Sequence, residues 1–559
     1  MSEIILDVER LTVDLPPWAD RPQAVTGVSL NLRRNEILCV VGESGSGKSV
    51  MARAIMRLLP APHLRASAGR VLLDGEDLLK ADPTRMRELR CSRISMVFQE
   101  PMTALNPVKT IGAQIDEVLA LHTDLPRRTR TDRMVAMLES VRLSEAARVM
   151  RAYPHEISGG QRQRAMIAMA LILEPWVLIA DEPTTALDVT TQAGILALIR
   201  DVQRSRHMGV VFITHDFGVV AEIADRVAVM QQGRLVEFGD AAQVLNAPSH
   251  AYTQALIAAI PGLTPMTRAA NDAAPHVLSV RALDKTYRAG GLFGGERAVR
   301  ALKSVELTVR RGETLGLVGE SGSGKSTLAR CIVRLVHADN GSVIVRDVDW
   351  MKLTRRELRA HRRYVQIVFQ DPFGSLDPRC TVGRLIAEGP VVCGVPEAEA
   401  LARAYSLLEL VGLDRRAADR YPHEFSGGQR QRIGIARALA LDPSILVADE
   451  PVSALDVSVQ AQVLRLLADI RDRFNLAMLF ITHDLRVAAQ VCDRIAVMRD
   501  GEIVEHGETA RVYADPQHPY TRELLAAVPG RHWQRSVVGE AAVRSMPGHS
   551  RVLDRRELS

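Results

Sequence analysis

Long apolar runs are missing from this sequence. No uninterrupted stretch reaches the ~18 residues that a membrane-spanning helix needs, and the longest candidate, near residues 165–180, is broken by Glu174 and Pro175. The first residues, MSEIILDVERL, lack the charged-then-apolar layout of a signal peptide. We therefore expect a cytoplasmic chain that does not cross a membrane and that reaches one only through partners.

Paired cysteines are missing as well. The chain has six cysteines, and no CxxC pair occurs among them. Scattered single cysteines are typical of reduced thiols in a cytosolic protein, and they argue against a disulfide framework, a zinc site or an iron–sulfur cluster. We expect small buried thiols. The six are Cys39, Cys91, Cys331, Cys380, Cys393 and Cys492.

A strong charge of one sign is also lacking. The formal net charge is +5 over 559 residues, which gives no reason to expect a nucleic-acid surface. The composition is 47% hydrophobic and 25% charged, as in soluble globular proteins with packed cores. At ordinary domain sizes, this length predicts roughly two to four domains.

A set of short motifs is present twice, in the same order. The copies lie 268 to 277 residues apart, and this nearly constant offset predicts a duplicated domain. The pairs are Lys48 and Lys325 in GESGSGKS, Gln99 and Gln370 in VFQEP and VFQDP, Asp181 and Asp449 in ADEP, and His215 and His483 in ITHD.

The repeat sets the expected domain boundaries. The first copy covers residues 1–262, a short polar linker covers 263–276, and the second copy covers 277–530. Residues 531–559 have no counterpart in the first copy. We expect them to form a flexible, solvated tail, and a contact surface remains the alternative.

Apolar runs alternate with helix-like segments in each copy. Continuous apolar runs predict buried parallel strands; they cover residues 36–41, 177–180 and 210–213, and 314–318, 445–448 and 478–481. The helix-like segments MARAIMRLL and TLARCIVRL follow Gly-rich loops. This alternation predicts an α/β fold with a mostly parallel sheet that binds ligands at the carboxyl ends of its strands.

The Gly-rich loops match the phosphate-binding pattern GxxxxGK[ST]. Glycines let backbone N–H groups close around phosphates, the lysine neutralises β- and γ-phosphate charge, and the serine hydroxyl ligates Mg²⁺. The predicted ATP-binding residues are Gly42, Glu43, Ser44, Gly45, Ser46, Gly47, Lys48, Ser49 and Val50, and Gly319, Glu320, Ser321, Gly322, Ser323, Gly324, Lys325, Ser326 and Thr327.

An Asp-Glu pair ends one apolar strand in each copy. Asp181 and Asp449 are predicted to hold the Mg²⁺ shell. The adjacent Glu182 and Glu450 are expected to point to the opposite side of an extended chain and to act as general bases on an attacking water. Taken alone such a pair is commonly a solvated turn, but the phosphate loop upstream favours the catalytic interpretation.

A Ser-Gly-Gly-Gln motif precedes a helix-like run in each copy. Its helix N-terminus presents unpaired N–H groups that can hold an anion, while a simple N-cap is an equally good interpretation of the same residues. The residues are Ser158, Gly159, Gly160 and Gln161, and Ser426, Gly427, Gly428 and Gln429.

Taken together, the order of these motifs resembles the ATP-binding-cassette (ABC) ATPases over nearly all of both halves. The resemblance implies two tandem cassettes, each with a RecA-like mostly parallel core, an antiparallel β region and a helical subdomain. It also implies head-to-tail pairing in which one ATP lies between Lys48 and Ser426, and the other between Lys325 and Ser158.

The same resemblance assigns roles to further residues. It places Mg²⁺ near Ser49, Gln99, Asp181, Ser326, Gln370 and Asp449. His215 and His483 are implied to contact the γ-phosphate, and Asp188 and Asp456 belong to loops that link the sites. Because both copies keep these elements, we expect both to hydrolyse ATP.

Some positions depart from the family pattern. Ile157 and Phe425 replace the usual Leu before SGGQ, and Val50 stands where the second loop has Thr327. Tyr287 matches the aromatic residue that stacks on adenine. The first copy has Leu15 at that place, with Trp18 as a possible substitute.

A narrower resemblance is to the ATPases of di- and oligopeptide importers. It rests on SHAYTQALIAAIPG and PYTRELLAAVPG after each cassette, on EPMTALNP and DPFGSLDP, and on YPHEISGGQ and YPHEFSGGQ. Fused relatives import peptides or glutathione, and nickel importers are close cousins. The implied partners are two membrane permeases and an extracytoplasmic solute-binding protein, which place the chain peripherally at the cytoplasmic face of the membrane.

Other branches of the family are less consistent with the sequence. Ribosome-acting tandem cassettes carry a long charged linker, which this chain lacks, and the DNA-repair branch carries zinc-binding cysteine clusters. A binding module without turnover is disfavoured by the complete set of catalytic residues. Exporters commonly fuse spanning helices to the cassette. The sequence does not identify the transported solute.

Overall fold

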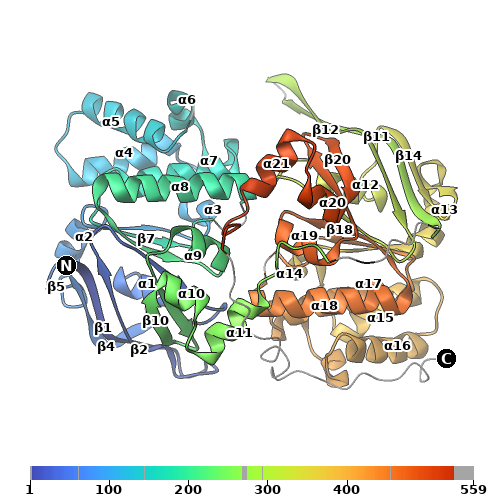
Figure 1. Ribbon diagram of the computed structural model, residues 1–559, viewed down its shortest axis with the longest axis horizontal. Helices are drawn as coiled ribbons and strands as arrows, with labels where there is room; N and C mark the ends of the chain where they lie inside the picture. Colours follow the sequence, from blue (N-terminus) through green and yellow to red (C-terminus); the bar gives the residue numbers. More distant parts are fainter. Residues whose placement is uncertain are drawn as a thin grey trace. The chain divides into compact units, whose positions relative to one another are not determined.

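The computed structural model describes residues 3–60, 62–143, 145–184, 187–266, 268, 273–291, 294–453 and 455–533. The chain divides into two units (Figure 1). Unit 1 comprises Met1–Ala259 together with Val528–Arg544, and unit 2 contains Ile260–Ala527. Among the described residues, none of the helices combines the length and the apolar character that a membrane span requires.

The central sheet of unit 1 has six strands. Their order is β10 (Arg234–Asp240), β9 (Arg226–Gln231), β3 (Ile37–Val41), β8 (Gly209–Ile213), β7 (Val177–Asp181) and β6 (Ile94–Val97). All neighbours are parallel except β10 on β9. Strands β3, β7 and β8 are buried along their whole length, which is why their sequences are apolar apart from Asp181 at the end of β7.

A second, antiparallel sheet completes the core of unit 1. Its order is β2 (Gln23–Arg33), β1 (Ile4–Asp14), β4 (Arg65–Leu73) and β5 (Glu76–Asp77). The hydrophobic core joins side chains of this sheet, of helix α1 (Lys48–Ile55) and of β7 and β8. Strand β3 and helix α1, which flank the phosphate loop, both contribute side chains to this core.

Helices α4 to α6 form a separate group, at the end of unit 1 opposite the antiparallel sheet (Figure 1). They pack on α7. The remaining bounds are α2 (Pro83–Leu89), α3 (Pro101–Ala104), α4 (Ile111–His122), α5 (Arg127–Ser140), α6 (Ala146–Arg151), α7 (Gly159–Leu171), α8 (Val189–Arg206), α9 (Phe217–Ile223), α10 (Ala241–Asn246) and α11 (Ala251–Ala259).

Unit 2 repeats this architecture. Its six-stranded sheet has the order β16 (Val365–Val368), β17 (Ile445–Asp449), β18 (Ala477–Thr482), β13 (Thr314–Val318), β19 (Arg494–Arg499) and β20 (Glu502–Glu508). Its antiparallel sheet has the order β12 (Gly294–Arg310), β11 (His276–Gly291), β14 (Asn340–Val345) and β15 (Val348–Asp349). The predicted fold class, with a mostly parallel core, an antiparallel region and a helical subdomain, is confirmed.

The helices of unit 2 correspond to those of unit 1 in their order along the chain. They are α12 (Lys325–Ile332), α13 (Arg355–His361), α14 (Pro372–Ser375), α15 (Val382–Val392), α16 (Glu397–Leu410), α17 (Gly427–Leu439), α18 (Val457–Phe474), α19 (Leu485–Val491), α20 (Thr509–Ala514) and α21 (Pro519–Ala526).

Each unit includes a segment from the far end of the other repeat. In unit 1, the Gly530 backbone N–H donates to Glu222 Oε2 at 3.4 Å, and Trp533 Nε1 donates to Asn246 Oδ1 at 2.9 Å. In unit 2, Gln490 Nε2 donates to the Gly262 carbonyl at 3.1 Å. Residues 534–559 of the predicted tail, and 267 and 269–272 of the predicted linker, lie outside the described residues.

Candidate active site

The phosphate loop of unit 1 connects β3 to α1 and needs glycine at two of its turns. Gly42 has φ +150°, and a Cβ there would lie 2.2 Å from the Met230 carbonyl oxygen. Gly47 has φ +101°, and its Cβ would lie 2.6 Å from the Ala24 carbonyl oxygen. Neither space admits a side chain. Gly319 and Gly324 meet the same limits in unit 2.

The loop lysine is buried and fully directed at the loop. Lys48 is 5% exposed, and its Nζ donates to the Gly42 carbonyl at 2.7 Å and to the Glu43 carbonyl at 2.8 Å. A buried ammonium group needs such partners. In unit 2, Lys325 Nζ donates to the Gly319 and Glu320 carbonyls at 2.9 and 2.6 Å.

A hydroxyl and a carboxylate converge beside each loop. Ser49 Oγ, in the first turn of α1, donates to Asp181 Oδ1, at the end of β7, over 2.8 Å. Burial raises the pKa of Asp181. The corresponding bond between Ser326 and Asp449 is 3.1 Å. These hard oxygen donors fit Mg²⁺, which takes one or two protein carboxylates together with water and phosphate oxygens.

The predicted base, the glutamine and the histidine meet at the carboxyl ends of the strands. Gln99 Nε2 donates to Glu182 Oε2 at 2.9 Å, and His215 Nδ1 lies 3.5 Å from the same oxygen. In unit 2, Gln370 Nε2 donates to Glu450 Oε2 at 2.8 Å, and His483 Nδ1 lies 3.2 Å from Glu450 Oε1. The three sequence-predicted residues therefore form one cluster in each unit.

The electrostatics of the cluster follow from this pairing. Burial lowers the pKa of His215, but the hydrogen bond and negative charge of Glu182 outweigh it, so that the pKa lies above its usual value. His483 behaves in the same way beside Glu450. Burial would raise the pKa of Glu450, yet His483 holds it below the ordinary value. Glu450 is thus a carboxylate at neutral pH, as a general base must be.

The backbone at the predicted bases differs from the extended chain that the sequence suggested. Strand β7 ends at Asp181, and Glu182 has φ +46°, in the left-handed region. Its N–H donates to the Ile213 carbonyl at 3.0 Å, at the end of the neighbouring strand β8. This bond turns the chain and orients Glu182. Glu450 has φ +48° and donates to Ile481.

The SGGQ segment forms a capping box at the start of α7. Gln161 N–H donates to Ser158 Oγ at 3.3 Å, and Ser158 N–H donates to Gln161 Oε1 at 3.0 Å. Gly160 is needed for packing, because a Cβ there would lie 2.7 Å from Thr191 Cγ2 on α8. Ser158 and Gly159 are exposed, so this helix N-terminus faces outward.

The residues expected near adenine have different surroundings in the two units. Tyr287 is 42% exposed, with Lys285 Nζ 5.6 Å from its ring centre. Leu15 packs against the core of unit 1, whereas Trp18 is 77% exposed and stacks edge-on against His63. Of the two residues, Trp18 is the exposed aromatic one. We therefore expect Trp18, rather than Leu15, to stack on adenine.

Sequence reasoning missed three residues that form hydrogen bonds with the loops: one arginine in unit 1 and one tyrosine in each unit. Arg21 Nη2 donates to the Gly45 carbonyl at 2.6 Å. Tyr252 and Tyr520, in the segments after each cassette, accept hydrogen bonds from the loop amides of Glu43 and Glu320. The repeated YT dipeptide was a signal for these tyrosines, but no periodicity relates residues so distant in sequence.

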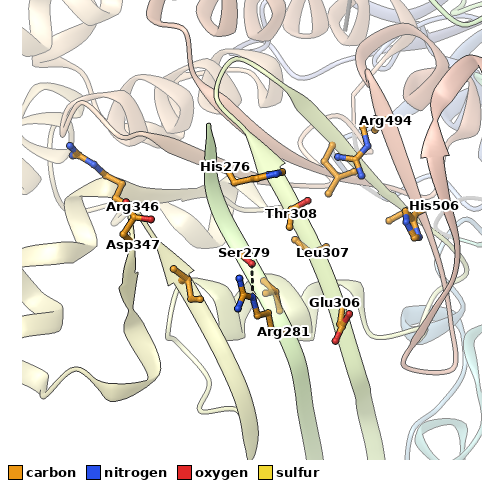
Figure 2. Close-up of a pocket in the computed structure, with 14 residues that line it drawn as sticks. His276, Ser279, Arg281, Glu306, Leu307, Thr308, Arg346, Asp347, Arg494 and His506 are labelled. Atoms are coloured by element: carbon orange, nitrogen blue, oxygen red, sulfur yellow. Dashed lines mark hydrogen bonds between the residues drawn. The ribbon is translucent and has the colours of Figure 1, made fainter. Parts of the chain in front are cut away.

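A hollow of about 710 Å³ lies elsewhere in unit 2, between its antiparallel sheet and strands β19 and β20 (Figure 2). It contains none of the predicted site residues. Its charged lining has both signs, with Arg281, Arg346 and Arg494 beside Glu306 and Asp347.

The fold and these clusters define a class of protein: a phosphate-loop ATPase whose chain contains the ATPase domain twice. A family model described as ABC transporter matches residues 25–185 and 302–453. A second model, described as oligopeptide/dipeptide transporter, C-terminal region, matches residues 236–294 and 504–545. The chain belongs to the ABC transporter ATPase family, and it is an ATP-binding, ATP-hydrolysing subunit with two cassettes.

Similar proteins cover nearly the whole chain. The glutathione import ATP-binding proteins GsiA of Shigella dysenteriae serotype 1 (strain Sd197) and of Escherichia coli (strain K12) are each 48% identical over 557 residues, or 94% of this chain and 89% of the relative. Among solved structures, the dimeric post-hydrolysis state of the ATP-binding cassette MJ0796 bound to ADP and Pi is 31% identical, covering 42% of this chain and 98% of the other, with a TM-score of 0.38.

Proposed function

We propose that this chain powers the import of di- or oligopeptides, or of glutathione-like peptides, as the ATPase subunit of an ABC importer. The observation that carries the proposal is the 48% identity to glutathione import ATP-binding proteins over 94% of the chain. The matched oligopeptide/dipeptide transporter C-terminal regions at 236–294 and 504–545 support the same solute class.

The partners follow from the chemistry of import. The chain binds two integral permease subunits at the cytoplasmic face of the membrane and, through them, serves an extracytoplasmic solute-binding protein. The segments after Gln99 and Gln370 pass the motion of the cassettes to the permeases. Peripheral binding is consistent with the lack of a spanning helix among the described residues.

Each cassette contributes half of two ATP sites. The loop around Lys48 pairs with the helix N-terminus at Ser426, and the loop around Lys325 pairs with Ser158. Ser49 and Asp181 would hold Mg²⁺ in one site, and the ion would supply positive charge beside the phosphates. The exposed N-terminus of α7 supports this assignment, because its free N–H groups and dipole favour a phosphate.

The protein residues then carry out hydrolysis. Lys48 and the loop amides hold the phosphates, Glu182 orients and deprotonates the attacking water, and His215, which lies 3.5 Å from Glu182 Oε2, holds that carboxylate in place. Two bound nucleotides draw the cassettes together, and hydrolysis removes the charges that bridge them. Glu450 and His483 have the same roles in the second site.

Substitution of both bases tests the mechanism. Glu182→Gln with Glu450→Gln keeps the shape and the Gln99 and Gln370 environments but removes the bases, so ATP should still bind while turnover is abolished. Equilibrium ATP binding and phosphate release measure the two effects. Near-normal ATPase activity in this double variant would discard the assignment of the base.

Uptake tests the solute class. Cells that lack this gene should regain uptake of labelled glutathione or dipeptide with the wild-type chain, but not with the Glu182→Gln/Glu450→Gln variant. The chain should also purify with integral membrane proteins. Purification with ribosomes, together with unchanged uptake in the deleted cells, would contradict the importer assignment.

A further inference from the structure

The segment that follows each cassette touches the phosphate loop of that cassette. In unit 1, the Glu43 backbone N–H donates to Tyr252 Oη, on α11, at 3.2 Å. In unit 2, the Glu320 N–H donates to Tyr520 Oη, on α21, at 3.1 Å. Each contact lies inside one unit and joins residues 209 and 200 positions apart, respectively. Its recurrence indicates that the contact is built into the cassette.

The tyrosine is held by a short chain of hydrogen bonds. The Tyr252 N–H donates to His250 Nδ1 at 3.2 Å. Glu237, on β10, accepts from the Ser249 N–H at 2.7 Å and from the His250 N–H at 3.2 Å. The segment before α11 is thereby fixed to the edge strand of the central sheet, and the hydroxyl of Tyr252 has a defined position over the loop.

Unit 2 has the same chain of contacts with different flanking residues. The Tyr520 N–H donates to His518 Nδ1 at 3.2 Å, and Glu505, on β20, accepts from the Gln517 and His518 N–H groups at 2.8 and 3.0 Å. Ser249 and Gln517 differ, yet both supply a backbone N–H to the strand glutamate. The glutamate, the histidine and the tyrosine are thus the same in both units, and only the residue before the histidine differs.

Tyr520 is an internal side chain. It is 2% exposed, and the Arg499 guanidinium lies 4.7 Å from its ring centre. Burial, more than the neighbouring charge of Glu320, raises its pKa to about 12. The hydroxyl is therefore neutral at physiological pH, and it accepts the Glu320 N–H as an uncharged phenol.

The loop residue that meets the tyrosine also meets the loop lysine. The Glu43 N–H binds Tyr252, while the Glu43 carbonyl accepts from Lys48 Nζ at 2.8 Å. Glu320 joins Tyr520 to Lys325 in the same way, with a lysine contact of 2.6 Å. The backbone N–H of this loop residue binds the tyrosine, and its carbonyl binds the loop lysine. The residue thus connects the C-terminal segment to the lysine.

We propose that Tyr252 and Tyr520 are positioning residues that set the phosphate loop, so that the C-terminal segment of each cassette tunes its affinity for ATP. The hydroxyl acts through the Glu43 or Glu320 peptide and does not touch the nucleotide. The proposal rests on ATP binding by the two loops. It does not depend on which solute is imported.

The expected kinetic effect is on binding rather than on chemistry. We expect the loop amides to hold phosphate oxygens about equally in the ground and transition states, because the base and its histidine follow other strands of the sheet. Loss of uniform binding raises KM and leaves kcat unchanged. A structural role without positioning would instead lower the amount of folded enzyme and leave KM as it was.

The test removes only the two hydroxyls. Tyr252→Phe with Tyr520→Phe, made in the full chain, should weaken Mg·ATP binding roughly threefold to tenfold, the scale of one lost hydrogen bond at each loop. Binding is measured in the Glu182→Gln/Glu450→Gln background. With the bases intact, KM for ATP should rise by the same factor, and kcat should stay within about twofold.

Matched controls separate positioning from general damage. Tyr405→Phe, on α16, alters a ring that lies against the Arg415 guanidinium and should leave affinity and KM unchanged. Should the tyrosine pair fold poorly, His250→Gln with His518→Gln loosens the same tyrosines and should shift KM in the same direction. Amide hydrogen exchange over residues 42–49 and 319–326 should increase in both double variants.

Three results would overturn the proposal. One is unchanged ATP affinity and unchanged loop exchange in folded Tyr252→Phe/Tyr520→Phe. Another is a fall in kcat with KM unaltered. The third is an equal loss of affinity in Tyr405→Phe. None of these involves transport, so the importer assignment and this proposal fail separately.

Discussion

Charged residues around the phosphate loops are buried, and burial determines which partners they need. Lys48 is almost completely buried and is held by two loop carbonyls, and Asp181 is buried against the Ser49 hydroxyl. Groups taken from water in this way must keep their partners, because an uncompensated buried charge is strongly destabilising. The lysine is therefore held in place inside the loop, where we predict that it meets the phosphates.

Removal of both loop lysines should nearly abolish ATP turnover. Lys48→Ala with Lys325→Ala deletes one charge-stabilising donor per site, and the rate should fall about 10²–10³-fold. Steady-state phosphate release measures it. Lys80→Ala, at an exposed lysine that pairs with Asp77, should change the rate little. Wild-type turnover in the double variant would contradict the assigned role.

The His483–Glu450 pair should make stability depend on pH. The folded pKa of His483 lies above 6.5, so its contribution is complete below pH 6.5 and is lost as the pH rises through the folded value. The folded pKa of Glu450 lies below 4.5, so its contribution is complete above pH 4.5 and is lost as the pH falls through that value. The pair therefore contributes fully between these limits.

Urea unfolding measures this dependence. His483→Gln should lower the unfolding midpoint more at pH 6 than at pH 8.5, where the wild-type histidine is less protonated than at pH 6. Salt should reduce the difference, because both side chains are partly exposed. A loss that is equal at the two pH values would show that charge pairing does not contribute.

Among the elements, the strands were more predictable than the turns between them. The run at residues 314–318 is strand β13 from end to end, because a parallel strand that is buried on both faces is mostly apolar. Helix α1 begins at Lys48, three residues before the apolar segment, since Gly47 in a left-handed conformation starts it. The left-handed turn at Glu182 has no sequence signature, because it depends on a bond to the neighbouring strand β8.

The site was predictable to a similar extent. Lys48, Asp181, Glu182 and His215 could be placed at one sheet edge, because parallel strands bring their carboxyl ends together. The contact of Tyr252 with the loop could not be predicted, since it depends on how the segment after β10 folds back over the sheet.

Helix α17 offers a test of close packing. A Cβ at Gly428 would lie 2.3 Å from Val459 Cγ1 on α18, whereas Gly434 in the same helix has nothing within 4 Å. Gly428→Ala should therefore destabilise unit 2 by about 1–3 kcal/mol through overpacking, and Gly434→Ala should stabilise it by up to about 1 kcal/mol through helix propensity. Denaturant unfolding compares them; equal effects would contradict the packing argument.

At the scale of the whole molecule, the proposed ATP sites need both cassettes. In a chain whose native cysteines are replaced, with Glu182→Gln and Glu450→Gln, the pair Ser44→Cys and Ser426→Cys should crosslink when ATP is bound. The pair Ser321→Cys and Ser158→Cys should do the same. The control pair Ser44→Cys and Ser158→Cys, within one cassette, should not. Absence of both cross-cassette links with ATP bound would refute the shared sites.

The chain leaves unit 1 after Ala259 and returns to it at Val528. Suppose that the chain were made as two polypeptides, separated between residues 268 and 273. Each polypeptide would then carry a stretch that belongs to the fold of the other. The first product would lack the partner of Glu222, and the second would lack the partner of Gln490. Fusion of the two halves secures an equal supply of both, and separately expressed halves should depend on each other for complete folding.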